Sequence, residues 1–189
     1  MKKEFVFVHG MSHGAWCWEL VQARLDRAGH ATLAVDLPGH GRRAHERRRA
    51  SVGGYARAVA DAMSLAGFSR AIVVGHSMGG IVIPKVAELV PARARWMTDL
   101  PVGDLRVTGA LARLTPQPLR PWVERVDMQR FYAMSVPRTY VRCLGDAAII
   151  PAKAAEYAAR LGVTPIDLDC AHGPMLSEPD ALVRILETL

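Results

Sequence analysis

The stretch that decides the fold runs from Ala71 to Val90 and reads AIVVGHSMGGIVIPKVAELV. Its first four residues form an apolar, β-branched run that is typical of a buried parallel strand. The next five residues, GHSMG, have the spacing G-x-S-x-G, and the residues from Met78 onward follow as a predicted helix. Pro84 lies inside this helix, where it removes one backbone hydrogen bond and favours a kink. The pattern predicts a sharp strand–turn–helix unit with Ser77 at its turn.

Strand-like and helix-like segments alternate along the rest of the chain. Short apolar runs indicate strands at 5–8, 32–35, 71–74, 138–144 and 165–168, and a weaker run lies at 95–98. Apolar residues at helical spacing indicate helices over 18–28, 52–66, 152–161 and 182–189. This alternation predicts an α/β fold with a mostly parallel central sheet and helices on both faces. The length of 189 residues suits a single domain over residues 1–189.

Charge and composition limit the partners and the compartment. The net charge is +6, and much of the excess lies in Arg42–Arg49, which contains no aromatic residue to stack on a base. We interpret this run as a solvated loop and expect no nucleic-acid partner. No apolar run is long enough to cross a membrane, and His9 and His13 have no carboxylate or cysteine partner that would make a metal site. An odd number of cysteines without metal-ligand spacing favours free thiols in a reducing cytoplasm: Cys17, Cys143 and Cys170.

A serine at such a turn suits nucleophilic catalysis. The turn holds Ser77 in a strained conformation with its hydroxyl exposed, and glycines two residues away on either side let the backbone pass closely. The helix N-terminus offers the N–H of Met78 and a positive dipole end to a developing oxyanion. The loop after the first strand is expected to supply a second N–H, from Met11, and Gly10 lets that loop approach the reacting carbonyl.

Chain order selects the base and the acid. With a serine nucleophile on such a turn, the acid follows it in the chain and the histidine comes last. His172 is the histidine that follows Ser77, in a turn shaped by glycine and proline. Asp146 ends the strand predicted at 138–144, and from there it can reach the imidazole and fix its tautomer. Asp99, after the weaker strand at 95–98, is the rival; the sequence favours Asp146.

Taken together, these segments resemble one branch of the α/β-hydrolase family. It contains plant methyl-ester esterases of the salicylate-binding type, hydroxynitrile lyases and bacterial esterase relatives. The likeness lies in the segments 9–18, 36–41, 75–80, 145–151 and 172–179. It covers residues 1–95 and 138–189, and implies Ser77, Asp146 and His172 as a triad with no cofactor. The lyases typically carry threonine at the position of Gly10 and lysine at that of Gly173, so both residues favour the esterase side.

The resemblance also predicts a reduced cap. Members of the branch usually carry a helical cap before the acid strand and are longer than this chain. Here residues 101–137 alone are available for a cap or lid insertion. The larger side chains of this insertion could form a pocket wall or simply cover the core, and the sequence favours neither: Trp122, Met128, Phe131, Tyr132 and Met134.

From these features we expect a serine hydrolase that cleaves a small, mostly apolar carboxylic ester through an acyl-enzyme on Ser77. Two alternatives stay open. One is a lyase or polyketide cyclase-type enzyme that uses His172 as a general base, and the other is a non-catalytic protein that binds a small molecule on the same fold. A small-molecule ester is the expected partner, and the sequence leaves open whether the chain forms a homodimer.

Overall fold

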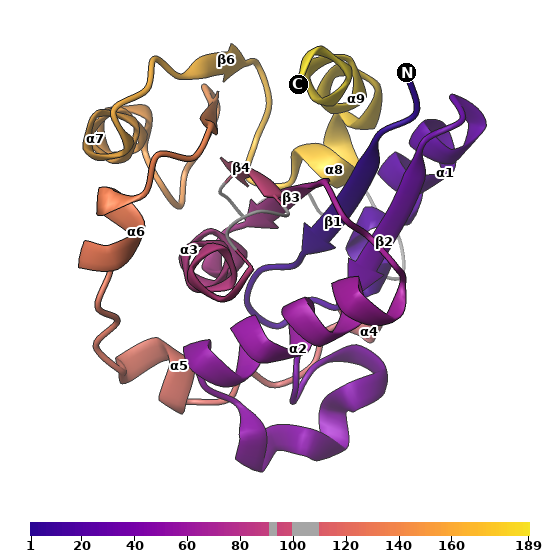
Figure 1. The fold of residues 1–189 in the computed structure, drawn as a ribbon. Coiled ribbons are helices and arrows are strands. Elements are labelled where there is room, and N and C mark those ends of the chain that lie inside the picture. The colour runs from indigo at the N-terminus through magenta and orange to yellow at the C-terminus, as the bar shows by residue number, and fades with distance from the viewer. Residues whose placement is uncertain (91–93, 100–109) are drawn as a thin grey trace.

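A parallel β-sheet forms the centre of the molecule (Figure 1). The computed structural model describes residues 1–90, 94–99 and 110–189, and only the backbone at 94–99, 110 and 111. In this part of the chain the strand order is β2-β1-β3-β4-β5-β6, with every neighbouring pair parallel. The predicted parallel sheet is thereby confirmed. Its strands are β1 (Glu4–Val8), β2 (Ala31–Val35), β3 (Ala71–His76), β4 (Ala94–Asp99), β5 (Arg138–Cys143) and β6 (Ile166–Leu168).

Helices cover both faces of the sheet, as the alternating pattern predicts (Figure 1). One face packs against α1 (Glu19–Arg27), α8 (Pro174–Ser177) and α9 (Pro179–Thr188). The other face packs against α2 (Val52–Leu65), α3 (Met78–Leu89) and α7 (Pro151–Leu161). Three short helices lie between β4 and β5: α4 (Ala110–Arg113), α5 (Arg120–Val123) and α6 (Gln129–Ala133). Two 3₁₀ segments, η1 (Ala15–Trp18) and η2 (Gly41–Arg49), lie in the connections around β2.

The core is divided by the sheet because strand side chains alternate between its two faces. Val6 and Val73 face the cluster under α2 and α3, whereas Phe7 and Val74 face the cluster under α1 and α9. In the second cluster Phe7 stacks on Trp18 with ring centroids 4.8 Å apart. Complete burial of one such side chain stabilises the fold by about 2 kcal/mol. This two-sided packing holds the carboxyl ends of β1 and β3 side by side.

The structure differs from the sequence prediction at the arginine-rich run. Most side chains of Arg42–Arg49 are exposed, as expected of a solvated loop, but the backbone forms the 3₁₀ turns of η2. Arg42 pairs with the buried carboxylate of Asp36 at 2.9 Å, and Arg43 pairs with Glu46 at 2.7 Å. Hydrophobic periodicity does not predict this local structure, because the ion pairs that hold it are formed with nearby carboxylates. The run is therefore tied to the end of β2 through Asp36, while several of its other side chains remain exposed.

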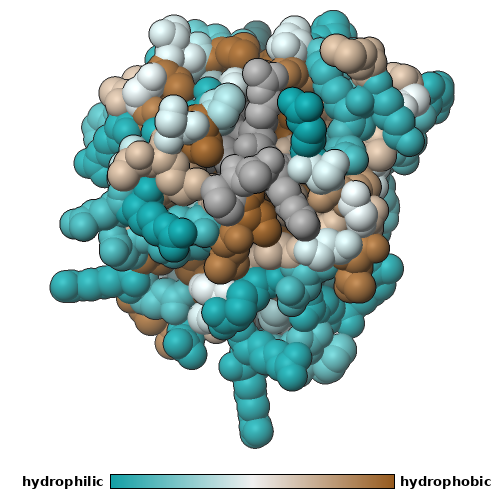
Figure 2. All heavy atoms as spheres, viewed as in Figure 1, coloured by the Kyte–Doolittle hydropathy of each residue, from teal (hydrophilic) through white to brown (hydrophobic). Residues whose placement is uncertain are grey.

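The surface combines polar and apolar areas. Hydrophobic side chains gather near the middle of the face shown in Figure 2, and hydrophilic side chains surround them. In the described ranges, no helix has both the length and the apolar character that a membrane span requires.

His9 is fully buried directly after β1 and links this strand to the end of β2. Its Nδ1–H donates to the carbonyl oxygen of Gly10 at 2.8 Å, and its Nε2 accepts from the backbone N–H of Leu37 at 3.1 Å. The second hydrogen bond requires a neutral ring, because a protonated Nε2 cannot accept. Burial, together with the nearby His40, lowers the pKa of His9 from 6.5 to about 3.

This burial predicts acid sensitivity. The unfolded chain protonates His9 below about pH 6.5 and the folded chain only near pH 3, so stability present at neutral pH is lost as the pH falls through this window. His9 alone is expected to lower the free energy of unfolding by about 1.4 kcal/mol for each pH unit within the window. Urea denaturation of the wild type and His9→Gln at several pH values measures this slope.

His45→Gln is the matched control, because the His45 side chain is 77% exposed. The wild type and His45→Gln are expected to lose stability in parallel, and His9→Gln less steeply. Equal slopes for all three proteins would show that His9 is not the group that titrates.

Candidate active site

Ser77 lies at the junction between β3 and α3. Its backbone has φ 52° and ψ −123°, a conformation that a residue with a side chain rarely adopts and that costs about 1–3 kcal/mol. The side chain is half-buried and lines a cavity. The following residue, Met78, begins α3, so its N–H belongs to the first turn, whose donors have no partner inside the helix.

Three glycines permit the close contacts that this turn requires. A Cβ atom on Gly79 would lie 2.4 Å from the carbonyl oxygen of Val8, and one on Gly75 would lie 2.6 Å from the carbonyl oxygen of Gly79. A Cβ on Gly10 would lie 2.8 Å from Cβ of Ser77. The atoms that would clash with a Cβ on Gly75 or Gly79 belong to the backbone, so they cannot move aside as the end of a flexible side chain can. The loop after β1 thus packs directly against Ser77.

The loop after β1 is itself strained at Ser12. This residue has φ 61°, in the left-handed region that costs a residue with a side chain about 1–2 kcal/mol. His13 donates from Nδ1 to the carbonyl oxygen of Met11 at 2.7 Å and thereby closes the loop. Met11 lines the same cavity as Ser77 and Met78. The two backbone positions predicted as oxyanion donors therefore flank the serine.

His172 and Asp146 are brought together from the loops that follow β6 and β5. His172 Nδ1 lies 3.6 Å from Asp146 Oδ1, and both side chains are buried. Asp146 Oδ1 accepts the N–H groups of Ala148 and Ile149, each at 2.8 Å, which orients the carboxylate. Burial raises the pKa of Asp146. His172 Nδ1 has no hydrogen-bond partner within the described residues, so the two groups face one another slightly beyond hydrogen-bond distance.

His76 joins the segment of His172 to the residue before Ser77. Its Nε2–H donates to the carbonyl oxygen of His172 at 2.8 Å, and the two rings lie 5.2 Å apart between centroids. The ring of His13 lies 5.9 Å from that of His76. Burial, followed by the influence of His76 and His13, lowers the pKa of His172 to about 2. His172 is consequently a neutral imidazole at physiological pH.

Asp99, the rival acid, lies at the end of β4, where its backbone is in register with His76. Its side chain falls outside the described part of the structure. Asp146 is the candidate for which a contact with the imidazole is described.

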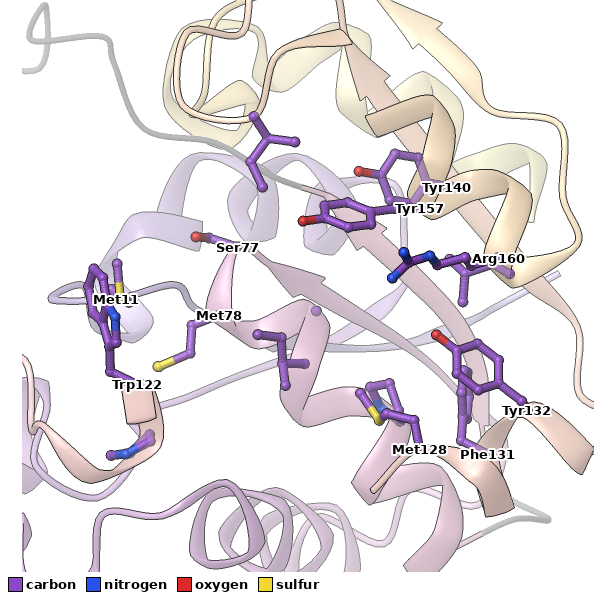
Figure 3. A pocket seen from close by; sticks show the side chains of 16 residues that line it. Met11, Ser77, Met78, Trp122, Met128, Phe131, Tyr132, Tyr140, Tyr157 and Arg160 are labelled. Atoms are coloured by element: carbon purple, nitrogen blue, oxygen red, sulfur yellow. The ribbon is translucent and has the colours of Figure 1, made fainter. Parts of the chain in front are cut away.

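A cavity of about 450 Å³ opens beside Ser77 (Figure 3). Met11 and Trp122 lie at one end, and Met128, Phe131 and Tyr132 at the other. Tyr140, Tyr157 and Arg160 run along one side and contribute polar groups to it. Its remaining lining is largely apolar: Met78, Ile81, Pro84, Pro121, Ile149 and Leu161.

The cap region contributes to this cavity. Four of its large side chains named from the sequence, Trp122, Met128, Phe131 and Tyr132, line the cavity, whereas Met134 packs against the core. Residues 101–109 of the predicted cap lie outside the described residues. In the described ranges, no group of three or more histidine, cysteine or acidic side chains is arranged to hold a metal ion.

Sequence reasoning missed Gln117 and Arg160. Gln117 contacts the loop at Ser12 across 105 positions of sequence, and Arg160 reaches the cavity from the end of α7. Neither residue belongs to a motif with a recognisable spacing. A glutamine between two prolines, 116 and 118, is the one local sign that this segment has a fixed conformation.

Comparison with known proteins assigns the family. A family model described as the alpha/beta hydrolase family matches residues 5–134. Esterase PIR7B of Oryza sativa subsp. japonica is 42% identical over 95 residues, 48% of this chain and 35% of that protein. The carbendazim hydrolyzing esterase of Nocardioides sp. is 32% identical over 135 residues, 71% of this chain and 56% of that protein. The chain thus matches less than two thirds of the length of either relative.

Solved structures agree on the fold. An extracellular alpha/beta-hydrolase from a Paenibacillus species superposes with a TM-score of 0.86 at 20% identity, covering 98% of each chain. The methylesterase MES16 from Arabidopsis superposes with a TM-score of 0.83 at 23% identity, also over 98% of each chain. Because the family model matches more than half of its residues, this chain belongs to the alpha/beta hydrolase family.

Proposed function

We propose that the chain is a serine hydrolase that cleaves a small, mostly apolar carboxylic ester through an acyl-enzyme on Ser77. The observation that carries the proposal is the strained turn at Ser77, which presents its side chain to a cavity of about 450 Å³. The packing of the His172 segment against His76 adds a buried imidazole close to this turn. The named esterases among the relatives support ester cleavage, although their matches cover only part of each protein.

In the proposed reaction the Ser77 hydroxyl attacks the ester carbonyl and His172 Nε2 accepts its proton. The N–H groups of Met11 and Met78 stabilise the resulting oxyanion. When the tetrahedral intermediate collapses, the alcohol leaves with the proton from His172 and the acyl group remains on Ser77. Water, deprotonated by His172, then attacks the acyl-enzyme and releases the carboxylic acid.

Asp146 orients the imidazole in this mechanism and stabilises the imidazolium that forms. The 3.6 Å separation between His172 Nδ1 and Asp146 Oδ1 fits a pair that tightens when substrate binds, as catalytic hydrogen bonds commonly do. Burial keeps the His172 ring unprotonated in the free protein. The closer contact with Asp146 stabilises the imidazolium and so makes the ring basic enough to accept the serine proton. The two backbone N–H groups on Asp146 Oδ1 hold the carboxylate in place meanwhile.

The cavity lining supports the choice of substrate. Methionine, isoleucine, proline and aromatic side chains dominate the wall, which favours an apolar acyl or alcohol group. A volume of about 450 Å³ lies within the range of small-molecule sites.

Ser77→Ala is expected to abolish hydrolysis of p-nitrophenyl acetate, lowering kcat roughly 10³-fold or more, because the acyl-enzyme cannot form. A fluorophosphonate probe is expected to add one covalent adduct to the wild type, located at Ser77 by peptide mass, and none to the variant. Circular dichroism and thermal unfolding check that the variant keeps the fold. Turnover by Ser77→Ala at the wild-type rate would exclude the acyl-enzyme.

Asp146→Asn is expected to lower kcat roughly 10²–10⁴-fold, because an amide cannot stabilise the imidazolium or fix the same tautomer. The asparagine oxygen can still accept from Ala148 and Ile149, so the local turn is retained. Asp99→Asn is the matched comparison and is expected to keep kcat within about threefold of the wild type. A large loss in Asp99→Asn with little effect of Asp146→Asn would reverse the assignment of the acid.

A further inference from the structure

Gln117 lies where the loops after three neighbouring strands meet. Its side-chain oxygen Oε1 accepts from the backbone N–H of Ser12 at 3.1 Å, in the loop after β1. The same oxygen accepts from His40 Nε2 at 2.9 Å, in the loop after β2. Both donors are fixed groups, since His40 is fully buried and Ser12 is held by its own backbone contacts.

The amide nitrogen of Gln117 completes this arrangement. Nε2 donates to the carbonyl oxygen of Pro118 at 3.1 Å, which fixes the amide in one orientation, and it lies 3.5 Å from Sδ of Met78, the first residue of α3. One side chain from the connection between β4 and β5 therefore contacts the loops that follow β1 and β2 and the first residue of α3.

Thr115 holds the other side of Ser12. Its backbone N–H donates to the Ser12 carbonyl oxygen at 2.8 Å, and its hydroxyl lies 3.4 Å from the same oxygen. Ser12 has the left-handed φ of 61° and directly follows Met11. Segment 115–117 therefore satisfies both backbone polar groups of the strained residue that determines how the chain leaves Met11.

We propose that Gln117 is a positioning residue for the oxyanion hole, an inference that rests on the proposed function. It does not line the cavity, so it acts through Ser12 rather than by touching the substrate. By accepting the Ser12 N–H it fixes the peptide plane between Met11 and Ser12. The Met11 N–H lies in the adjoining plane, between Gly10 and Met11, so its direction follows from this plane through the torsion angles at Met11 Cα. Its contact with Met78 ties the second donor residue to the same amide.

This role affects the transition state more than the substrate complex. The oxyanion forms only when Ser77 attacks, so a misdirected Met11 N–H lowers kcat while ground-state binding in the apolar cavity is retained. Loss of general packing at the same position would raise KM or lower stability instead.

Three variants separate these effects. Gln117→Leu removes the oxygen that accepts hydrogen bonds from the Ser12 N–H and from His40 Nε2. Gln117→Glu keeps an oxygen for both donors but loses the Nε2 donor to Pro118, so it tests the acceptor oxygen by itself. Gln129→Leu is the matched control, because Gln129 is an exposed residue of α6 that does not line the cavity.

With p-nitrophenyl acetate, Gln117→Leu is expected to lower kcat about 10- to 100-fold and to change KM less than about twofold. Gln117→Glu is expected to recover part of kcat, because the acceptor oxygen is kept while the Nε2 donor is lost, and Gln129→Leu to match the wild type. The rate of fluorophosphonate labelling at Ser77 is expected to rank the variants as kcat does, with Gln117→Leu the slowest. Should Gln117→Leu fail to fold, Gln117→Asn, whose shorter side chain withdraws the oxygen from Ser12, takes its place.

A folded Gln117→Leu protein with wild-type kcat and labelling rate would overturn the role of Gln117 while leaving the serine hydrolase intact. Equal losses in Gln117→Leu and Gln117→Glu would also overturn it, because the acceptor oxygen would then not matter. A wild-type protein that neither reacts with the probe nor hydrolyses the ester would overturn the proposed function as well, so the two failures are distinguishable.

Discussion

The structure depends on the close backbone contact between the end of β1 and the turn at Ser77. Gly79 lies against the carbonyl of Val8, and Gly10 lies against Ser77 itself, at distances that leave no room for a Cβ atom. The contact is available because β1 and β3 are parallel neighbours in register, with Val8 opposite Gly75. Two buried clusters on opposite faces of the sheet hold that register. Core packing thus determines how closely the nucleophile and the loop of Met11 approach one another.

Burial at this end of the sheet has a chemical consequence and a thermodynamic one. Removing His172 from water lowers its pKa, which keeps the ring neutral and makes it harder to protonate. The same removal of His9 from water makes the fold sensitive to acid, since a protonated His9 can no longer accept from Leu37. Burial of these two histidines therefore keeps both rings neutral at physiological pH and contributes to the acidic limit of stability.

The sequence predicted what local chemistry encodes. The turn at Ser77, the alternating strands and the acid and histidine segments each carry their signal within about ten residues. The arginine-rich run was predicted as a solvated loop, and most of its side chains are exposed. The sequence did not predict its 3₁₀ turns, because its order comes from ion pairs with Asp36 and Glu46 rather than from apolar periodicity. Gln117 and Ser12 are 105 residues apart in the sequence, and their contact depends on how the Gln117 side-chain amide is oriented. No local sequence pattern predicts such a contact. Such contacts become visible only once the sheet order is known.

The region between β4 and β5 shows how a short insertion can serve the site in two ways. Helices α5 and α6 supply apolar wall through Trp122 and Phe131, a task that requires bulk but little geometric accuracy. Thr115 and Gln117 meet a stricter requirement, because each must match the backbone groups of Ser12 at hydrogen-bond distance. A wall tolerates substitution and resizing far better than a hydrogen-bonded support does. For the proposed hydrolase, changes in substrate range are therefore expected to arise at the wall, while the support of the loop after β1 constrains the reaction itself.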